Sequence, residues 1–266
     1  MYQLPYLIVI ALAALIILFT LVWLIQLRTR NAAIIDAVWS MSFPLMTAIY
    51  FVLIIGYPPR QWMVLGVVCL WGFRLGLYLL FRTLGYAEDV RYAALREEWG
   101  DQQDKRMLSF YYKQAVAAVI LSIPFILMMI NTTPWISAFE IAGAIICVTG
   151  VLGESIADQQ LKQFKSVAEN KGKIMRSGLW AWSRHPNYFF EWLVWVGFFV
   201  MSLSSAWGWT SIFGMLLMYY LLTKRTGIGY TEKQMLKSRG EAFVNYQREV
   251  SAFFPRPPKK ESPVAG

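Results

Sequence analysis

The only histidine of the chain lies in a stretch whose residue types could bind an anion. Ser183–Glu191 follows a run rich in Lys and Arg and opens a long apolar segment. Pro186 suits the first turn of a helix, because the N–H that proline lacks would have no partner there. The remaining N–H groups of that turn, beside Arg184 and His185, could hold a phosphate or a carboxylate. The alternative is an interfacial helix start whose polar residues only anchor the segment.

Charged side chains also occur inside two earlier apolar runs. Asp36 lies about one turn into its run, while Arg74, Tyr78 and Arg82 are spaced four apart and share one face of a helix. A charge in hydrocarbon is costly and normally faces a polar interior. Arg74 therefore needs an anion, which is Asp36 in a structural interpretation and a cofactor phosphate in a functional one. Asp36 could instead cap its helix at the interface.

A second group of charges follows the fifth apolar run. Glu154, Asp158 and Lys162 lie on one helical face, with Lys165 close by. The carboxylates could accept hydrogen bonds from ribose or adenine, and the lysines could hold phosphate. The alternative is an ordinary helix end with surface ion pairs, each worth about 0.3–0.5 kcal/mol.

The basic loop after these charges is interrupted by glycines. Gly172 and Gly178 let the backbone approach a ligand closely. The next run places Asn187 and Glu191 four apart on one face. Glu191 is therefore expected to join the inward-facing polar groups.

The elements that position these residues are apolar helices. The chain is 57% hydrophobic, and a membrane span needs roughly 20 such residues. Runs of this kind cover about 4–27, 34–55, 61–84, 110–131, 135–157, 187–204 and 206–223. The sequence therefore predicts an all-α, multi-pass integral membrane protein with seven transmembrane helices.

Basic residues alternate between loops and predict the orientation. Lys and Arg crowd every second loop and the C-terminal segment, whereas the opposite loops contain only Arg60. Because basic loops stay in the cytoplasm, the N-terminus is expected outside and the C-terminus inside. This bias and an attraction to anionic membrane lipids explain the net charge of +9. No nucleic-acid-binding module is present, and Cys69 and Cys147 lack metal-ligand spacing, so neither a nucleic acid nor a metal is expected.

The predicted organisation has three parts. Residues 1–30 form the first transmembrane helix and a basic loop, and 31–256 form the main transmembrane domain. That domain includes an interfacial helix within 85–113 and ends in one amphipathic cytoplasmic helix over 226–256. Residues 257–266 are expected to be a disordered polar tail.

Several short motifs resemble those of one known superfamily. They are Asp158-Gln159, Lys171-Gly172-Lys173, Gly178-Leu179-Trp180, Ser183-Arg184-His185-Pro186-Asn187-Tyr188, Glu191, Tyr246 and Phe254-Pro255. In this order, over about residues 30–256, they resemble the membrane steroid 5α-reductase superfamily, in particular the bacterial branch called DUF1295. The Arg-His-Pro-Asn-Tyr centre is shared with isoprenylcysteine carboxyl methyltransferases, which use S-adenosylmethionine. The motif therefore indicates the superfamily and not the cofactor.

The resemblance implies a seven-helix bundle that holds NADPH. The residues at positions where reductases contact NADPH are Arg74, Tyr78, Glu154, Asp158, Lys165, Lys173, Asn187 and Glu191. Lys165 and Lys173 replace arginines there, and Glu154 replaces an asparagine. The remaining candidates for cofactor binding are Arg82 from the shared helical face, Arg184 and His185 from the anion site, and Tyr246 from the C-terminal motif.

The resemblance also suggests catalytic positions, namely Asp36, Trp71 and Tyr78. Asp36-Ala37 falls where the steroid enzymes have a Gln-Glu pair that binds the substrate carbonyl, and Trp71 replaces a tyrosine that acts with that glutamate. Enone reduction needs hydride at the β-carbon while an acid polarises the carbonyl. An indole N–H can donate a hydrogen bond but cannot supply the proton. Asp36 is therefore the expected acid, provided its surroundings keep it protonated, which Arg74 nearby would oppose.

The function expected from these features is NADPH-dependent reduction of a C=C bond in an apolar enone or unsaturated lipid, in a bacterial inner membrane. One alternative is a membrane methyltransferase that uses S-adenosylmethionine, but this cofactor has no phosphate for the many basic residues to bind. Another is a lipid-binding scaffold without catalysis, which Trp71 at a catalytic position would favour. The oligomeric state stays open, a monomer included.

Overall fold

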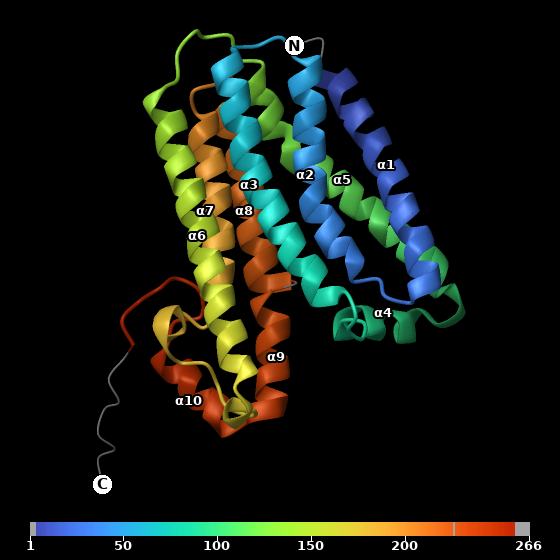
Figure 1. The fold of residues 1–266 in the computed structure, drawn as a ribbon, viewed down its shortest axis with the longest axis vertical. Helices are drawn as coiled ribbons and strands as arrows, with labels where there is room; N and C mark the ends of the chain where they lie inside the picture. Colours follow the sequence, from blue (N-terminus) through green and yellow to red (C-terminus); the bar gives the residue numbers. More distant parts are fainter. Residues whose placement is uncertain (1–3, 226, 259–266) are drawn as a thin grey trace. The chain divides into compact units, whose positions relative to one another are not determined.

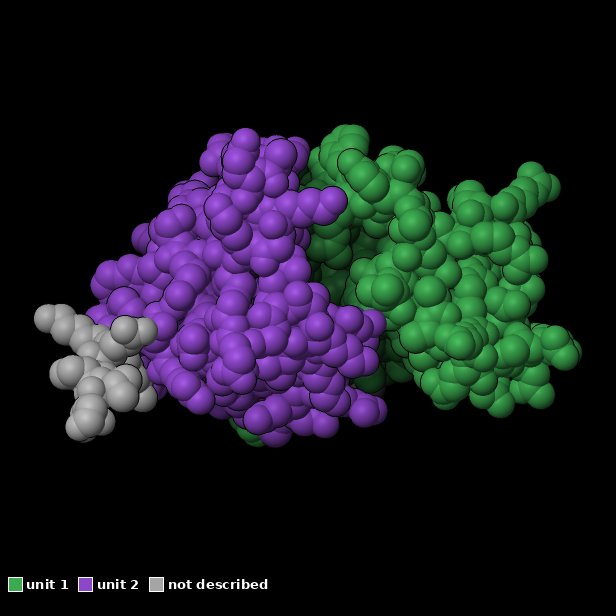
Figure 2. All heavy atoms as spheres, turned by 90° about the horizontal axis from the view of Figure 1, so that it is seen from below, with its two compact units in different colours: residues 1–141, 201–211 green, residues 142–200, 212–266 purple. Residues whose placement is uncertain are grey.

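The computed structural model describes residues 4–225 and 227–258, and its regular structure over these ranges is helical throughout (Figure 1). The chain divides into two compact units, coloured separately in Figure 2. Unit 1 comprises Met1–Ile141 and Met201–Ser211, and unit 2 comprises Ala142–Val200 and Ile212–Gly266. Residues 259–266, most of the predicted tail, lie outside the described residues.

Unit 1 is built on a group of long helices. They are α1 (Leu4–Thr29), α2 (Ile34–Leu53), α3 (Pro58–Thr83), the short α4 (Val90–Trp99) and α5 (Gln103–Met129). Helix α2 packs against α1, α3 and α5 (Figure 1). Its Phe43 contacts the rings of Trp71 and Phe125, with centroids 5.2 Å and 6.3 Å away. An apolar aromatic core therefore joins α2, α3 and α5.

Small residues let α2 and α3 approach closely. A methyl group added at Gly72 would lie 2.5 Å from Cδ of Pro44, and one added at Gly76 would lie 2.5 Å from Cγ of Met41. Small residues at such seams are how helices pack in lipid, where hydrophobic burial adds little. This close packing fixes which face of α3 contacts α2, and it thereby fixes the direction of the polar side chains of α3.

The helix predicted within 85–113 is present as α4, and its interfacial position stays a prediction. It begins after Asp89, whose side chain accepts the backbone N–H of Arg91 at 3.0 Å and so caps the helix. Helix α5 begins at Gln103, about two turns before the predicted start of its span. The added turns carry Asp104, whose carbonyl accepts the indole N–H of Trp23 in α1 at 2.9 Å and whose carboxylate lies 3.8 Å from Nη1 of Arg96 in α4.

Unit 2 contains the close pair α6 (Ala138–Ser166) and α7 (Pro186–Ser202). A Cβ atom at Gly153 would lie 2.3 Å from the ring of Phe190, and one at Gly197 would lie 2.4 Å from Sγ of Cys147. The indole N–H of Trp192 donates to the carbonyl of Met215 at 3.2 Å, which joins α7 to α8 (Ile212–Tyr220). Polar side chains at the α6–α7 seam are therefore held between closely packed backbones.

The C-terminal part of unit 2 differs from the prediction. A π-helical turn (Leu221–Arg225) follows α8, and α9 (Ile228–Arg239) and α10 (Glu241–Glu249) replace the single helix predicted over 226–256. The break falls at Gly240, whose φ of 54° suits the left-handed end of a helix. The prediction of one helix was wrong because this glycine ends α9 and turns the chain.

The protein is a membrane protein by the length and apolar character of its helices. Among the described residues, five helical segments are long and apolar enough to cross a bilayer: α1, α2, α3, the segment Val90–Met129 that contains α5, and α6. Helix α7 has 17 residues and α8 has 9. The seven-span count and the orientation of the termini stay predictions.

Candidate functional site

Arg74, Tyr78 and Arg82 line one face of α3, as their spacing predicted. The guanidinium carbons of Arg74 and Arg82 lie 5.4 Å and 5.9 Å from the centroid of the Tyr78 ring. Both contacts are in the range of cation–π attraction. The ring therefore holds two cations on one helical stripe, which suits a ligand with more than one phosphate.

Trp71 lies one turn before that stripe and is fully buried. Its ring contacts Phe43 at 5.2 Å in the aromatic core. The structure thus shows packing by Trp71, and a catalytic role for it stays a prediction.

Asp36 is paired with α4 and not with Arg74. Its carboxylate accepts a hydrogen bond from Nη2 of Arg91 at 2.8 Å and from the hydroxyl of Tyr92 at 2.6 Å. The structural alternative of an Asp36–Arg74 ion pair is therefore wrong. The role of Asp36 as an acid stays a prediction, and sequence analysis missed the Tyr92 hydroxyl, which donates its hydrogen to this carboxylate.

A charged network that sequence analysis did not assign holds α4 in unit 1. Arg96 donates to Glu88 at 2.9 Å and to the side chain of Gln26 at 2.5 Å. Glu88 also accepts the backbone N–H of Ala32 at 2.6 Å. The feature of the sequence that could have indicated this network is Gln26, a polar residue near the end of an apolar helix. Its side chain is fully buried. The network orients the helix that carries Arg91 and Tyr92.

Among its described residues, unit 2 buries three acids, two on α6 and one on α7. Glu154, Asp158 and Glu191 are each at most 5% exposed. Nδ2 of Asn187 donates to Asp158 at 3.3 Å, and the indole N–H of Trp195 donates to Glu191 at 3.1 Å. The structure therefore brings Asp158 of α6 to Asn187 of α7, two of the residues that the resemblance selected. It buries Glu154 and Glu191 on the same two helices. Lys165 and Lys173 are exposed on the same unit.

Arg184 and His185 bind the C-terminal helices. Nε of Arg184 donates to Oε1 of Glu232 in α9 at 2.8 Å. Nε2 of His185 lies within hydrogen-bond distance of the same oxygen, at 3.1 Å. Nη1 of Arg184 also donates to the carbonyls of Gln247 and Val250 in the α10 region. The residues predicted to hold an anion at the start of α7 are thus engaged by protein acceptors in this structure.

The segment after α10 runs along the turn before α7. The carbonyl of Ser251 accepts the N–H of Arg184 at 2.8 Å, and the hydroxyl of Ser183 donates to the carbonyl of Phe253 at 2.9 Å. The hydroxyl of Tyr246 donates to the carbonyl of Trp180, and Arg176 lies 5.3 Å from the Tyr246 ring. Tyr246 therefore fastens α10 to the loop before α7.

Stability is expected to fall in acid because of Glu232 and His185. Burial would raise the pKa of Glu232, but hydrogen bonds from His185 and Arg184 lower it from 4.5 to about 2. Burial lowers the pKa of His185 below 6.5, against the opposing effect of Glu232. Below these ordinary values the unfolded chain binds protons that the folded chain does not, so stability falls as the pH falls.

Thermal unfolding in detergent between pH 7.5 and pH 3.5 tests this expectation. The free energy of unfolding should begin to fall below about pH 6.5 because of His185, and to fall further below about pH 4.5 because of Glu232. The two losses together should be on the order of 1–2 kcal/mol after allowance for solvent screening. Glu232→Gln should flatten the profile, whereas Glu241→Gln, at an exposed position of α10, should leave it unchanged. A profile that is equally steep in both variants would contradict the expectation.

The chain belongs to the family described as "Protein of unknown function (DUF1295)", which it matches over residues 22–250. This confirms the DUF1295 part of the resemblance, and the matched range includes every candidate site residue from Asp36 to Tyr246. The chain is also similar to "Uncharacterized protein C594.04c" of Schizosaccharomyces pombe, with 27% identity over 271 residues that cover 90% of this chain and 77% of the yeast protein. No solved structure matches it.

Proposed function

We propose that this membrane protein is an NADPH-dependent reductase of a C=C bond in an apolar substrate. The observation that carries the proposal is the burial of Glu154, Asp158 and Glu191 on two neighbouring apolar helices. Ionisable groups in such a place are expensive to bury and generally serve a function. Carboxylates and the Asn187 amide are suited to ribose hydroxyls and the nicotinamide amide.

The cationic residues complete the donor set for this cofactor. Arg74 and Arg82 on the α3 stripe, with Lys165 and Lys173, would bind its phosphates. Bound NADPH would supply the hydride. Asp36, oriented by the Tyr92 hydroxyl, would polarise or protonate the substrate. The resemblance to steroid 5α-reductases supports this assignment. The proposal also includes seven transmembrane helices, an external N-terminus, a cytoplasmic C-terminus and a location in a bacterial inner membrane.

The substrate class follows from the surroundings. A carbonyl-activated double bond in a lipid-like molecule could enter from the bilayer, where exposed apolar side chains cover the helices. Membrane lipids and this apolar substrate are the expected partners.

A second candidate is an S-adenosylmethionine-dependent methyltransferase. It is favoured by the contacts among Arg184, His185 and Glu232, residues that also fit the isoprenylcysteine methyltransferase scaffold. It leaves Arg74, Arg82 and the loop lysines without a phosphate to bind, and for that reason the reductase is preferred. A scaffold without catalysis would explain Trp71 but not the buried acids.

Replacement of Arg74 by glutamine tests the reductase proposal. A lost phosphate contact of about 1.5–3 kcal/mol should weaken NADPH binding roughly 10- to 100-fold, with the fold intact. The matched control is Arg28→Gln at an exposed position of α1, and binding is followed by calorimetry in detergent. Loss of thermal stability with unchanged NADPH affinity would instead make Arg74 a structural residue.

A further inference from the structure

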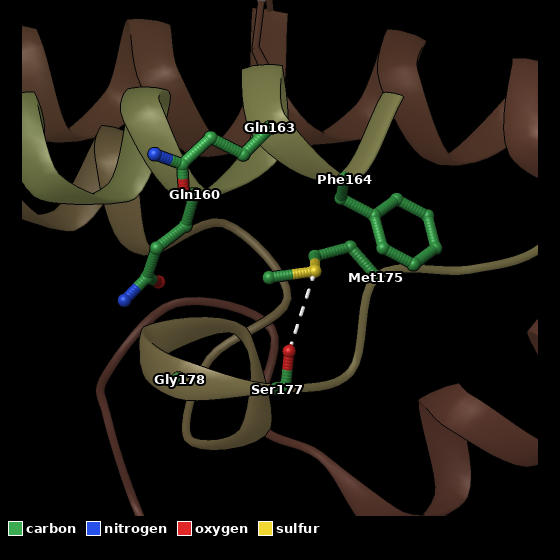
Figure 3. Close-up of a pocket in the computed structure, with 6 residues that line it drawn as sticks. All are labelled: Gln160, Gln163, Phe164, Met175, Ser177 and Gly178. Carbon is green, nitrogen blue, oxygen red and sulfur yellow. Dashed lines mark hydrogen bonds between the residues drawn. The ribbon is translucent and has the colours of Figure 1, made fainter. Parts of the chain in front are cut away.

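A small cavity lies in unit 2, where the end of α6 meets the loop before α7 (Figure 3). Its volume is about 250 Å³. The lining residues are Gln160, Gln163, Phe164, Met175, Ser177 and Gly178. This is below the roughly 300–1,000 Å³ of pockets that hold whole drug-sized ligands. The cavity therefore suits one ring system, such as a nucleobase, and not a whole dinucleotide.

Gly178 and Gln160 build one wall of this cavity. Gly178 has a φ of 60°, and a Cβ atom there would lie 2.5 Å from Nε2 of Gln160. The N–H of the next residue, Leu179, donates to Oε1 of Gln160 at 3.0 Å. This hydrogen bond and the packing on Gly178 fix the orientation of the Gln160 amide.

The lining side chains combine an aromatic face with amides. Figure 3 shows the amides of Gln160 and Gln163 on one side of the cavity and the Phe164 ring on the other, with the thioether of Met175 between them. Aromatic faces stack on nucleobases. Glutamine amides pair with the N6 and N7 edge of adenine. This combination is typical of a purine site and unusual for a lipid site.

Basic residues neighbour the lining residues in the sequence. Lys162 and Lys165 flank its α6 residues in the sequence, and Lys173 and Arg176 flank Met175. All four are exposed. By helical periodicity Lys162 and Lys165 lie away from the α6 lining residues, and Arg176 pairs with Glu249. Lys173 is therefore the candidate for a phosphate attached to that base.

We propose that this cavity binds the adenine ring of an adenine-containing cofactor. Adenine is common to NADPH and S-adenosylmethionine, so the cavity would serve either cofactor. The inference rests on the proposed function only in taking NADPH as the first source of the ring. Phe164 and the thioether of Met175 pack against the ring, and the amide of Gln163 reads its edge.

The test measures ligand affinity of the full chain in detergent. The probes are NADPH, 5′-AMP, reduced nicotinamide mononucleotide and S-adenosylmethionine. Phe164→Leu removes the aromatic face but keeps apolar volume, and Phe164→Tyr restores the ring. Phe139→Leu, at a position of α6 that is 55% exposed and outside the cavity, is the matched control.

The proposal expects Phe164→Leu to weaken NADPH and 5′-AMP roughly tenfold. Binding of the mononucleotide, which has no adenine, should be unchanged, and Phe164→Tyr should restore affinity. If NADPH binds equally to the wild type and Phe164→Leu, the cavity proposal fails while the reductase proposal stands. If only S-adenosylmethionine binds, and Phe164→Leu weakens it, the reductase proposal fails while the cavity proposal stands. If none of the adenine-containing probes binds the wild type, both are overturned.

Discussion

Replacement of Arg60 by methionine is expected to lower the stability of the folded protein strongly. Arg60 is 1% exposed and pairs with Glu140, which is equally buried. Its guanidinium also donates to the carbonyls of Asn131, Thr133 and Trp135 at 2.6, 3.0 and 2.7 Å. Removal of one partner of a buried ion pair costs about 3–5 kcal/mol, because the other charge stays buried. The apparent melting temperature in detergent should fall by roughly 10 °C.

Two variants separate this pair from a general effect of losing a charge. Arg106→Met removes an exposed arginine of α5 and should change the melting temperature by at most about 1 °C. The double variant Arg60→Met/Glu140→Met leaves no buried carboxylate at this position and should be more stable than Arg60→Met alone. If Arg60→Met lowered the melting temperature no more than Arg106→Met does, Arg60 would not be the residue that stabilises the segment 131–140.

The second large effect is expected for Arg184→Met, in the contacts that hold α9 and α10. The change removes the 2.8 Å ion pair with Glu232 and the hydrogen bonds to Gln247 and Val250. Hydrogen bonds to charged groups contribute about 1.5–3 kcal/mol each, and Glu232 would keep only its His185 and Gln247 donors. Residues 228–256 should therefore open locally more often than the rest of unit 2.

Amide hydrogen exchange followed by mass spectrometry measures this opening. Peptides from α9 and α10 should exchange roughly tenfold faster or more in Arg184→Met, while α6 peptides stay protected. Arg184→Lys should be intermediate, because it keeps the charge but loses the forked donors. Arg248→Met, at an exposed position of α10, is the control. Unchanged exchange in α9 and α10 would show that Arg184 does not hold them.

Local patterns predicted the helices well. The apolar runs of the first three spans match α1, α2 and α3 within a few residues, because lipid imposes a long apolar segment on every span. The stripe of Arg74, Tyr78 and Arg82 was likewise predictable, since it depends only on helical periodicity. The break at Gly240 could have been predicted from glycine as a helix terminator.

Pairings between distant residues could not be predicted in the same way. Asp36 meets Arg91 and Tyr92, more than 50 positions further along the chain. Arg60, interpreted from sequence as an isolated loop charge, takes its acceptors from residues 131–140. Such partners depend on how helices rotate and pack against one another, which is not encoded in the spacing along one helix. The burial of Asp158 beside Asn187 was expected only from the resemblance to reductases.

The measurement that tests the proposed function most directly is thermal stabilisation of the purified full chain by NADPH, NADH and S-adenosylmethionine. A ligand that binds only the folded state at about 100 times its Kd adds about 2.7 kcal/mol of stability, equivalent to roughly 5–10 °C in melting temperature. The reductase proposal predicts a shift of this size with NADPH and a smaller one with NADH. A shift with S-adenosylmethionine alone, or with none of the three, would contradict it.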